Sequence, residues 1–395
     1  MKKIAHIVFS VLCVGFLFAV MIGSLLIEKK ESSYYENRSL AVLPALTWEN
    51  FWDGSFFVAA DKVVDDHIIG RTQIMRTATR LDMALGRPVI TKLVVGGNDE
   101  PILPFEPFYK KENPWTPLAA EMMGEQLGKL NELITGYGGY FAYVGVPRQG
   151  EYFADAYPDY MTTLAAQDEQ YRSLMTAELA KHGVPFVNMY EEFLDRPDMF
   201  YLTDHHFSFD GAMLTSQTAL DRVNADTGLY LPVLRSEDWT MHTLPNPYLG
   251  SRNRQLYGLR PNDERLVYAT PTVPIAYEYR LTAYGNAVGQ LVVLPDDEQM
   301  EVTYLAYMGG DIPETAIATN RPELPNCLIF GESYTNAVET MIWTAFNETR
   351  SLDLRHYNKQ TLAEYIADWQ PDVVICMRDT SKFLEAEGNG VLGFE

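Results

Sequence analysis

The spacing of hydrophobic residues changes several times along the chain, and the first pattern is a long apolar run. After Lys2 and Lys3, positions 4 to 27 are apolar apart from one histidine and two serines. A run of about 20 apolar residues is long enough to cross a bilayer as a helix. Residues 1 to 30 are therefore predicted to form a transmembrane helix.

The same segment has a second interpretation, as a secretory signal peptide that is removed. A cleaved signal usually has a shorter apolar region and a small-residue cleavage site, and no Ala-x-Ala pattern is present here. We therefore favour an uncleaved signal anchor. This predicts a single-pass protein of the cell membrane with its bulk outside the cytoplasm, or an exported protein if the signal is cleaved.

Residues 31 to 90 are predicted to be a helical lead-in. They begin with a polar connector that contains Glu36-Asn37-Arg38, and from residue 56 to residue 86 the apolar positions recur at helical spacing. From residue 91 to residue 395 the pattern changes to short β-rich runs separated by helical stretches of 10 to 15 residues. This alternation indicates βαβ units and an α/β fold with a mainly parallel sheet. The β-rich runs are "KLVV", "FAYVGVP", "VPFVNMY", "NCLIF", "SLDLRHY" and "DVVICM".

The alternation is interrupted between about residue 230 and residue 325. Proline, glycine and tyrosine are frequent there, and strand-like pieces follow one another without intervening helices. We predict a β-rich insertion in the α/β domain. The strand-like pieces are "RLVYAT", "AYEYRLTAY" and "GQLVVLP".

Charge and cysteine content exclude several classes of function. The chain has 31 basic and 53 acidic side chains, for a formal charge of -22, which repels phosphate backbones and makes nucleic acid a poor partner. The three cysteines include one in the first apolar run. They form neither a disulfide framework nor a CxxC metal site.

Candidate chemistry lies where predicted strands end, because ligands of open α/β sheets gather at the carboxyl ends of the strands. Arg148, Ser333 and Arg355 occupy such positions, together with Arg378 and Asp379. Ser333 follows a Gly-Glu turn between a strand and a helix, where its hydroxyl can act as a nucleophile beside backbone amides that stabilise an oxyanion. The alternative is that Ser333 is a helix N-cap.

A base for this serine is available in the segment "LTDHHFSFDGA". Residues i and i+2 of an extended segment point to the same side, so Asp204 and His206 are predicted to face one pocket while His205 points away or packs beneath. A carboxylate beside an imidazole fixes its tautomer and favours the imidazolium. Ser208 is predicted to cap the helix that starts at Phe209.

Two other interpretations of Asp-His-His remain open. In one, the aspartate caps a turn and both histidines pack passively. In the other, the three residues bind a metal, because the run resembles the ligands of the DHH phosphoesterases. The remaining histidines show no HxH or HxxxH spacing with carboxylates, so we expect neither a metal nor another cofactor.

Several motifs together resemble one family. "YLTDHHFSFDGA", "YMGGD", "LIFGESYTN" and "LDLRHY" resemble the bacterial DHHW protein family, which is similar to the SGNH-hydrolase-like domains of the alginate O-acetylation proteins AlgX and AlgJ. The resemblance extends from Glu36 to Met377. It implies an SGNH-hydrolase-like, flavodoxin-like sheet with flanking helices and a Ser-His-Asp triad for acetyl transfer or ester hydrolysis on a polysaccharide.

Matched to the motifs, the triad falls on Ser333, His206 and Asp204. Two positions depart from the pattern: Phe207 stands where the family has tryptophan, and Glu332 stands where aspartate is usual. The resemblance also suggests supporting residues for oxyanion or substrate binding, with ion pairs and a tight turn as the structural alternatives. They are Asn336, Arg355, Arg148, His205, Tyr307, Gly309 and Gly310.

The leading hypothesis is a membrane-anchored, extracytoplasmic O-acetyltransferase or acetylesterase that acts on a cell-envelope or secreted polysaccharide. The resemblance also implies a membrane-bound O-acyltransferase partner that exports acetyl groups. The rival hypothesis is a non-catalytic glycan-binding or assembly protein that retains the fold. A metal-dependent phosphoesterase is the third.

Overall fold

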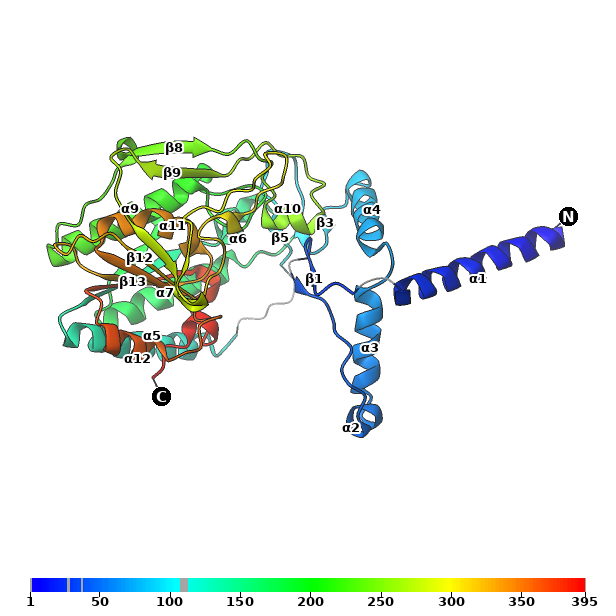
Figure 1. The fold of residues 1–395 in the computed structure, drawn as a ribbon, viewed down its shortest axis with the longest axis horizontal. Coiled ribbons are helices and arrows are strands. Elements are labelled where there is room, and N and C mark those ends of the chain that lie inside the picture. Colours follow the sequence, from blue (N-terminus) through cyan, green and yellow to red (C-terminus); the bar gives the residue numbers. More distant parts are fainter. Residues whose placement is uncertain (1, 27–28, 37, 107–112, 395) are drawn as a thin grey trace. The chain divides into compact units, whose positions relative to one another are not determined.

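A computed structural model describes residues 2–26, 29–36, 38–106 and 113–394 (Figure 1). Ile27, Glu28 and Asn37, which fall in the first predicted segments, lie outside the described residues. The chain forms two compact units. One comprises Met1–Thr91 and Asn253–Pro261, and the other comprises Lys92–Arg252 and Asn262–Glu395.

The first unit is mostly helical. Within α1, the stretch Lys3–Ser24 is long and apolar enough to cross a membrane, and none of it is buried against the described protein. Three further helices follow, of which α3 and α4 lie where helical spacing is predicted and α2 precedes that stretch. The elements are α1 (Lys2–Leu26), β1 (Ser32–Ser33), β2 (Arg38–Ser39), α2 (Trp48–Trp52), α3 (Ser55–Asp66), α4 (Arg71–Ala84) and β3 (Val89–Ile90).

The second unit is built on an eight-stranded sheet with the order β11-β10-β12-β14-β13-β15-β6-β7. The five strands from β14 to β7 run parallel, and the other three extend the sheet antiparallel. The predicted α/β fold with a mainly parallel sheet is confirmed. The strands are β6 (Tyr140–Val146), β7 (Phe186–Asn188), β10 (Glu278–Leu281), β11 (Ala287–Val288), β12 (Glu314–Ala318), β13 (Cys327–Gly331), β14 (Glu348–Leu352) and β15 (Val373–Asp379).

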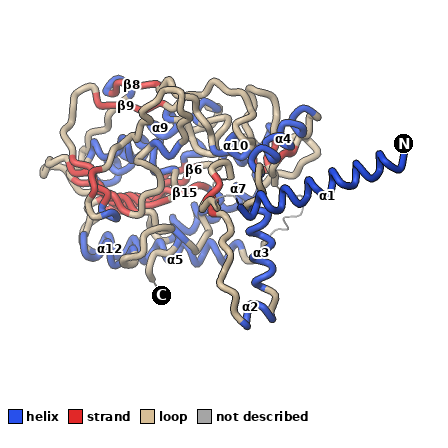
Figure 2. Tube along the Cα trace, turned by 45° about the vertical axis from the view of Figure 1, so that its right-hand side comes forward, coloured by secondary structure: helices blue, strands red, loops and turns tan. Residues whose placement is uncertain are grey.

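Helices cover both faces of this sheet, as Figure 2 shows for α9 on one side and α5 with α12 on the other. Successive side chains of a strand point to opposite faces. In β13, Ile329 therefore packs with α9 and α11, whereas Phe330 packs with α5, α7 and α12. Burial on both faces explains why the central strands read as continuous apolar runs. These helices are α5 (Thr116–Gly136), α7 (Ala165–Lys181), α9 (Phe209–Thr227), α11 (Tyr334–Ile342) and α12 (Leu362–Trp369).

The predicted β-rich insertion contributes to two sheets. β8 (Trp239–Thr243) pairs with β9 (Val267–Pro271) in a separate antiparallel ladder, while β10, β11 and β12 join the main sheet. The insertion also contains α10 (Ser251–Gln255).

Two predicted strands are corrected. "KLVV" supplies only β4 (Leu93–Val94), which pairs antiparallel with β5 (Leu103–Pro104) and not with the main sheet. "GQLVVLP" forms only an isolated bridge between Val292 and Tyr307. A short apolar run fits several kinds of pairing, so its partner is decided by tertiary contacts.

The remaining helices are short. Their bounds are α6 (Gln149–Tyr152) and α8 (Met189–Glu192), with single 3-10 turns at Ala154–Ala156, Pro197–Met199, Ser236–Asp238, Thr282–Tyr284, Tyr304–Ala306, Trp343–Ala345, Thr380–Lys382 and Gly388–Gly390.

Candidate active site

Ser333 lies at the turn between β13 and α11. An added Cβ on Gly331 would lie 2.0 Å from the carbonyl oxygen of Met377 in the neighbouring β15, so only glycine permits this close strand contact. Ser333 has helical dihedrals (φ -52°, ψ -15°), and its side chain makes no capping hydrogen bond. The half-buried hydroxyl is therefore not used as an N-cap.

The Asp-His-His segment lies in a tight loop just before α9. Phe200 and Phe207 pair across the base of this loop, and Ser208 caps α9 by accepting a hydrogen bond from Gly211 N at 3.3 Å, as predicted. On the other side, the carboxylate of Glu264 accepts hydrogen bonds from the backbone N–H groups of residues 202 and 203, at 2.5 and 3.1 Å. The loop is thus fixed at both sides.

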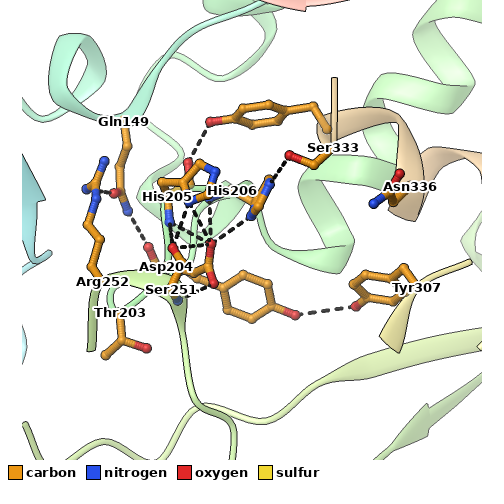
Figure 3. Close-up of polar contacts among 12 residues, drawn as sticks. Gln149, Thr203, Asp204, His205, His206, Ser251, Arg252, Tyr307, Ser333 and Asn336 are labelled. Atoms are coloured by element: carbon orange, nitrogen blue, oxygen red, sulfur yellow. Dashed lines mark hydrogen bonds and ion pairs between the residues drawn. The ribbon is translucent and has the colours of Figure 1, made fainter. Parts of the chain in front are cut away.

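The structure brings the three triad candidates into one hydrogen-bonded chain (Figure 3). Ser333 Oγ lies 2.7 Å from His206 Nε2, and His206 Nδ1 lies 2.7 Å from Asp204 Oδ1. The partners Ser333 and His206 are 127 residues apart in sequence. This order of hydroxyl, imidazole and carboxylate is the one required for serine activation.

Asp204 is buried and surrounded by donors. Its Oδ2 accepts hydrogen bonds from Ser251 N at 2.6 Å and from the Tyr248 hydroxyl at 3.1 Å, and its Oδ1 accepts from His205 N at 2.6 Å. Burial alone would raise the pKa of Asp204, but the positive charge of His206 and its ring hydrogen bond hold that pKa well below its usual range. The carboxylate therefore stays ionised and orients the imidazole.

The extended-segment prediction was that His205 points away from the pocket or packs beneath it, and in the structure the residue stays beside the triad. Its ring centroid lies 3.8 Å from that of His206, because the segment is a turn and not a strand. His205 Nδ1 lies 2.7 Å from Ser251 Oγ, and 44% of the side chain is exposed. His205 therefore forms part of the solvent-facing wall beside the triad.

Two tyrosines fix the imidazole of His206. Tyr304 stacks on its face, with ring centroids 3.7 Å apart and planes 5° apart. Tyr334, the residue after the serine, presents its ring edge at 5.0 Å and donates its hydroxyl to the His205 carbonyl oxygen at 2.5 Å. The same ring packs edge-on against buried Phe207 at 5.1 Å, so phenylalanine retains an aromatic contact at this position.

Glu332, the second departure from the motif, turns away from the triad toward the end of β15. Its Oε1 accepts a hydrogen bond from Arg378 Nε at 3.2 Å. Burial raises the pKa of Glu332 to about 7, although the nearby guanidinium opposes this shift. Asp379 accepts hydrogen bonds from Ser381. Glu332 and these strand-end residues therefore support the elbow without contacting the serine hydroxyl.

The predicted supporting arginines are engaged in ion pairs. Arg148 pairs with Glu106 and Asp168. This is the ion-pair role given above as the alternative to substrate binding, and it leaves the guanidinium of Arg148 occupied. Arg355 pairs with Asp353 at 2.6 Å and with Asp311 at 3.1 Å.

Asn336 lies one turn after Ser333 on α11. Its Nδ2 donates to Asp311 Oδ1 at 3.0 Å, and Asp311 in turn pairs with Arg355. Asn336 is therefore held in place by Asp311. One third of the Arg355 side chain remains exposed.

Tyr307 and the glycines after it are corrected. Tyr307 is fully buried, and its hydroxyl donates to the Val267 carbonyl oxygen at 2.5 Å, so this side chain belongs to the core and is closed to a substrate. Gly309 and Gly310 have φ of 80° and 101°. They form the tight turn that was the alternative, since left-handed dihedrals favour glycine.

Several residues that shape the site were missed in the sequence. The signal of most of them is weak because they lie in the insertion, far from the Asp-His-His and serine motifs, whereas Tyr334 directly follows Ser333 in its motif. One signal was available: an added Cβ on Gly250 would lie 2.3 Å from the Thr203 carbonyl oxygen, so a glycine is needed to bring Ser251 against Asp204. The missed residues are Tyr248, Gly250, Ser251, Glu264, Tyr304 and Tyr334.

Two clusters among the described residues have side-chain atoms close enough to share a metal ion. One is Asp204 with its two histidines, and the other joins Asp311, Asp353 and His356. In the first, the carboxylate already accepts several N–H and O–H groups. In the second, both carboxylates pair with an arginine. These partners oppose cation binding, and we assign neither cluster to a metal.

Comparison with known proteins finds related folds but no close sequence relative. No family model and no curated protein matches the chain. Bacillus cereus PatB1, solved with a sulfonyl adduct, superposes with a TM-score of 0.60 at 21% identity, covering 74% of this chain and 96% of PatB1.

Two further structures are similar. A DHHW family protein from Eubacterium siraeum gives a TM-score of 0.55 at 17% identity, covering 75% of this chain and 93% of its own. The O-acetyltransferase domain of Pseudomonas putida AlgJ gives a TM-score of 0.45 at 12% identity, covering 74% of this chain and 92% of the AlgJ domain. The resemblance first drawn from short motifs is thus confirmed at the level of the fold, which this chain shares with a DHHW family protein and with PatB1.

Proposed function

We propose that this protein is a membrane-anchored, extracytoplasmic serine-dependent O-acetyltransferase or acetylesterase that acts on a cell-envelope or secreted polysaccharide. The observation that carries the proposal is the pair of 2.7 Å contacts that link Ser333 to His206 and His206 to Asp204. Passive packing of the histidines would not require one imidazole to bridge a carboxylate and a half-buried hydroxyl at a strand-to-helix elbow. The likeness of the fold to PatB1 and to a DHHW family protein agrees with this assignment.

The mechanism follows from the order of these groups. Ser333 Oγ attacks the acetyl carbonyl carbon while His206 Nε2 takes its proton, and Asp204 stabilises the resulting imidazolium. The ester bond then breaks, and the leaving alcohol takes the proton from His206. Ser333 is left as an acetyl ester. The oxyanion that forms in each half-reaction lies near the first backbone N–H groups of α11.

The second half-reaction distinguishes the two activities. Water that loses a proton to His206 gives acetate and hydrolysis, whereas a sugar hydroxyl gives an O-acetylated glycan. The partly exposed ring of His205 and the exposed part of Arg355 are the polar groups that we assign to substrate contact. A membrane-bound O-acyltransferase that supplies acetyl groups on the outer side is the partner that transfer would require.

The first test is Ser333→Ala, assayed with a chromogenic acetyl ester and with a sulfonyl fluoride. The native protein should release a burst of chromophore and gain the mass of one sulfonyl group on Ser333. The variant should lose both signals, because no other group in the proposed mechanism attacks the ester. Ser236→Ala is the matched control, since Ser236 is exposed and lies outside the triad contacts.

An undiminished burst in Ser333→Ala would contradict the proposal. The rival function, a glycan-binding protein that retains the fold, would instead show retention on a polysaccharide column with no turnover by the native protein. Adding an acceptor polysaccharide separates the two activities, because a transferase gives acetylated glycan at the expense of free acetate.

A further inference from the structure

The helix α4 has an exposed apolar stripe. Ile74, Leu81 and the following Leu85 are 57%, 59% and 62% exposed, while Thr79 on another side is buried. With Ala78, these positions follow the spacing i, i+4, i+7, i+11, which places them along one side of a helix. Exposed apolar surface of this kind marks an interaction site.

The charge around this stripe is opposite to that of the chain. Positions 71 to 87 contain four arginines and one aspartate, a net charge of +3, whereas the chain carries -22. Arg76 and Arg80 are both exposed, and among the described residues neither forms an ion pair. A basic helix with an exposed apolar stripe is typical of segments that lie at an anionic membrane surface.

The helices α2 and α3 carry a second exposed apolar group, which is aromatic. Trp48 and Trp52 stack with ring centroids 6.2 Å apart and are 77% and 76% exposed. Phe51 packs against Trp52 at 5.3 Å, and Phe57 beside it is 53% exposed. Tryptophan is enriched at the boundary between the hydrocarbon core and water.

The junction between α3 and α4 adjoins the end of the predicted membrane span. Ile69, which lies between α3 and α4, donates its backbone N–H to Ser24 Oγ at 3.0 Å and packs against Gly23 near the end of α1. From this junction α3 and α4 run in opposite directions, crosswise to α1 (Figure 1). If α1 crosses a bilayer, these helices lie along its surface.

We propose that residues 48 to 85, which we call the platform, dock on the outer leaflet of the same bilayer that α1 crosses. The apolar stripe and the tryptophans enter the headgroup region. The positive charges of Arg76 and Arg80, on the side of α4 away from the stripe, attract the anionic headgroups across the helix. This inference rests on the membrane anchoring in the proposed function and is independent of the acyl chemistry. Anchoring by α1 alone leaves the first unit free to pivot, whereas a docked platform attaches that unit to the bilayer at a second place.

The experiment uses the full chain in vesicles, with an environment-sensitive fluorophore at Leu81→Cys. Cys13→Ser removes the exposed native thiol, and the other two cysteines are buried. The matched control is Thr72→Cys, an exposed position on the opposite side of α4. In vesicles of phosphatidylcholine with phosphatidylglycerol, the Leu81 probe should shift to the blue and be quenched by brominated lipids, while the Thr72 probe should remain in water.

The charges are tested on the same vesicles. Arg76→Gln and Arg80→Gln should each weaken docking by roughly fivefold, and high salt should reduce the difference between the native and substituted platforms. Equal Leu81 signals in vesicles of phosphatidylcholine alone and in those with phosphatidylglycerol would overturn the role of the arginines.

Two controls separate this inference from the proposed function. Carbonate extraction checks α1: release of the chain would overturn both anchoring and docking. If the chain is retained but the Leu81 probe stays in water, docking is overturned while ester hydrolysis by Ser333 is untouched. A probe that leaves water only in native membranes, and not in pure lipid, would assign the platform to a protein partner and also overturn the proposal.

Discussion

Asp204 organises the site at the scale of single residues. One of its oxygens contacts the ring of His206 and the backbone N–H of His205, and the other binds Ser251 and Tyr248. A carboxylate held by this many donors has a fixed position as well as a depressed pKa. The imidazole that it orients therefore has a defined tautomer.

Asp204→Asn tests this role. An amide presents either a donor to His206 Nδ1 or a weaker, uncharged acceptor, so the tautomer and the imidazolium both lose support. We expect the rate of ester hydrolysis to fall by about 10³- to 10⁴-fold, while circular dichroism shows an unchanged fold. Burst kinetics of the purified variant provide the measurement.

Tyr248→Phe is the matched control for Asp204→Asn. It removes one neutral donor to the same carboxylate and leaves the charge in place. The expected loss is about tenfold or less, in line with the net contribution of one hydrogen bond. If Asp204→Asn and Tyr248→Phe lost the same amount of activity, the charge of the Asp204 carboxylate would not be needed for ester hydrolysis.

At the scale of elements, the β-rich insertion serves the site. It supplies Glu264 and Ser251, which hold the Asp-His-His loop from outside the parallel sheet. The loop itself has few backbone bonds of its own, so its shape depends on these partners. The insertion and the parallel sheet therefore together form one wall of the candidate site.

Gly250→Ala tests this dependence. The new Cβ would meet the Thr203 carbonyl oxygen at 2.3 Å, so the backbone must shift and Ser251 N must leave Asp204. A displacement near 1 Å can cost about 100-fold in rate, and we expect a loss of that order in the acetyl ester assay.

Gly136→Ala is the control for this substitution. An added Cβ there meets no atom within 4 Å, and the residue lies in the last turn of α5. Its activity should equal that of the native protein. A Gly250→Ala protein with native activity would mean that the loop does not need the insertion.

At the scale of the whole molecule, a buried acid links stability to pH. Glu339 on α11 is 4% exposed, and its Oε1 accepts hydrogen bonds from Thr335 and Ser351 at 2.5 and 2.7 Å. Burial raises the pKa of Glu339 to about 7, against these hydrogen bonds. The native protein therefore holds a proton that the unfolded chain has released above pH 4.5.

The sign of the effect follows from this difference. Between about pH 4.5 and 7 the native state binds more protons than the unfolded state, so the free energy of unfolding falls as pH rises. Glu339→Gln, a neutral replacement, should reduce this slope and gain stability relative to the native protein above pH 7. Urea midpoints from pH 5 to pH 8 measure it.

Glu121→Gln on the exposed face of α5 is the control. It should keep the native pH slope, because its side chain is in water in both states. The free energy of unfolding of Glu339→Gln should still depend on pH to some extent, since burial raises the pKa of Glu332 to about 7 as well. An unchanged slope in Glu339→Gln would mean that this carboxyl is ionised in the native state.

The sequence alone determined the local features of this protein. Continuous apolar runs identified the central strands β6, β13 and β15, and the N-cap residue Ser208 identified the start of α9. These predictions succeed because burial of one or two faces of an element imposes a pattern of apolar residues that is visible within 10 to 20 positions. The motifs also located Ser333, His206 and Asp204, and the family resemblance suggested that they act as one triad.

Only the tertiary structure decided which candidates meet. Sheet order places the end of β13 beside a loop 127 residues earlier in the chain, which joins Ser333 to His206, and ion pairs withdraw Arg148 from the predicted role. The turn at residues 202 to 206 places the His205 ring against that of His206. Such contacts depend on partners far away in sequence, and no local period encodes them, because a side chain's environment is set by whatever packs against it.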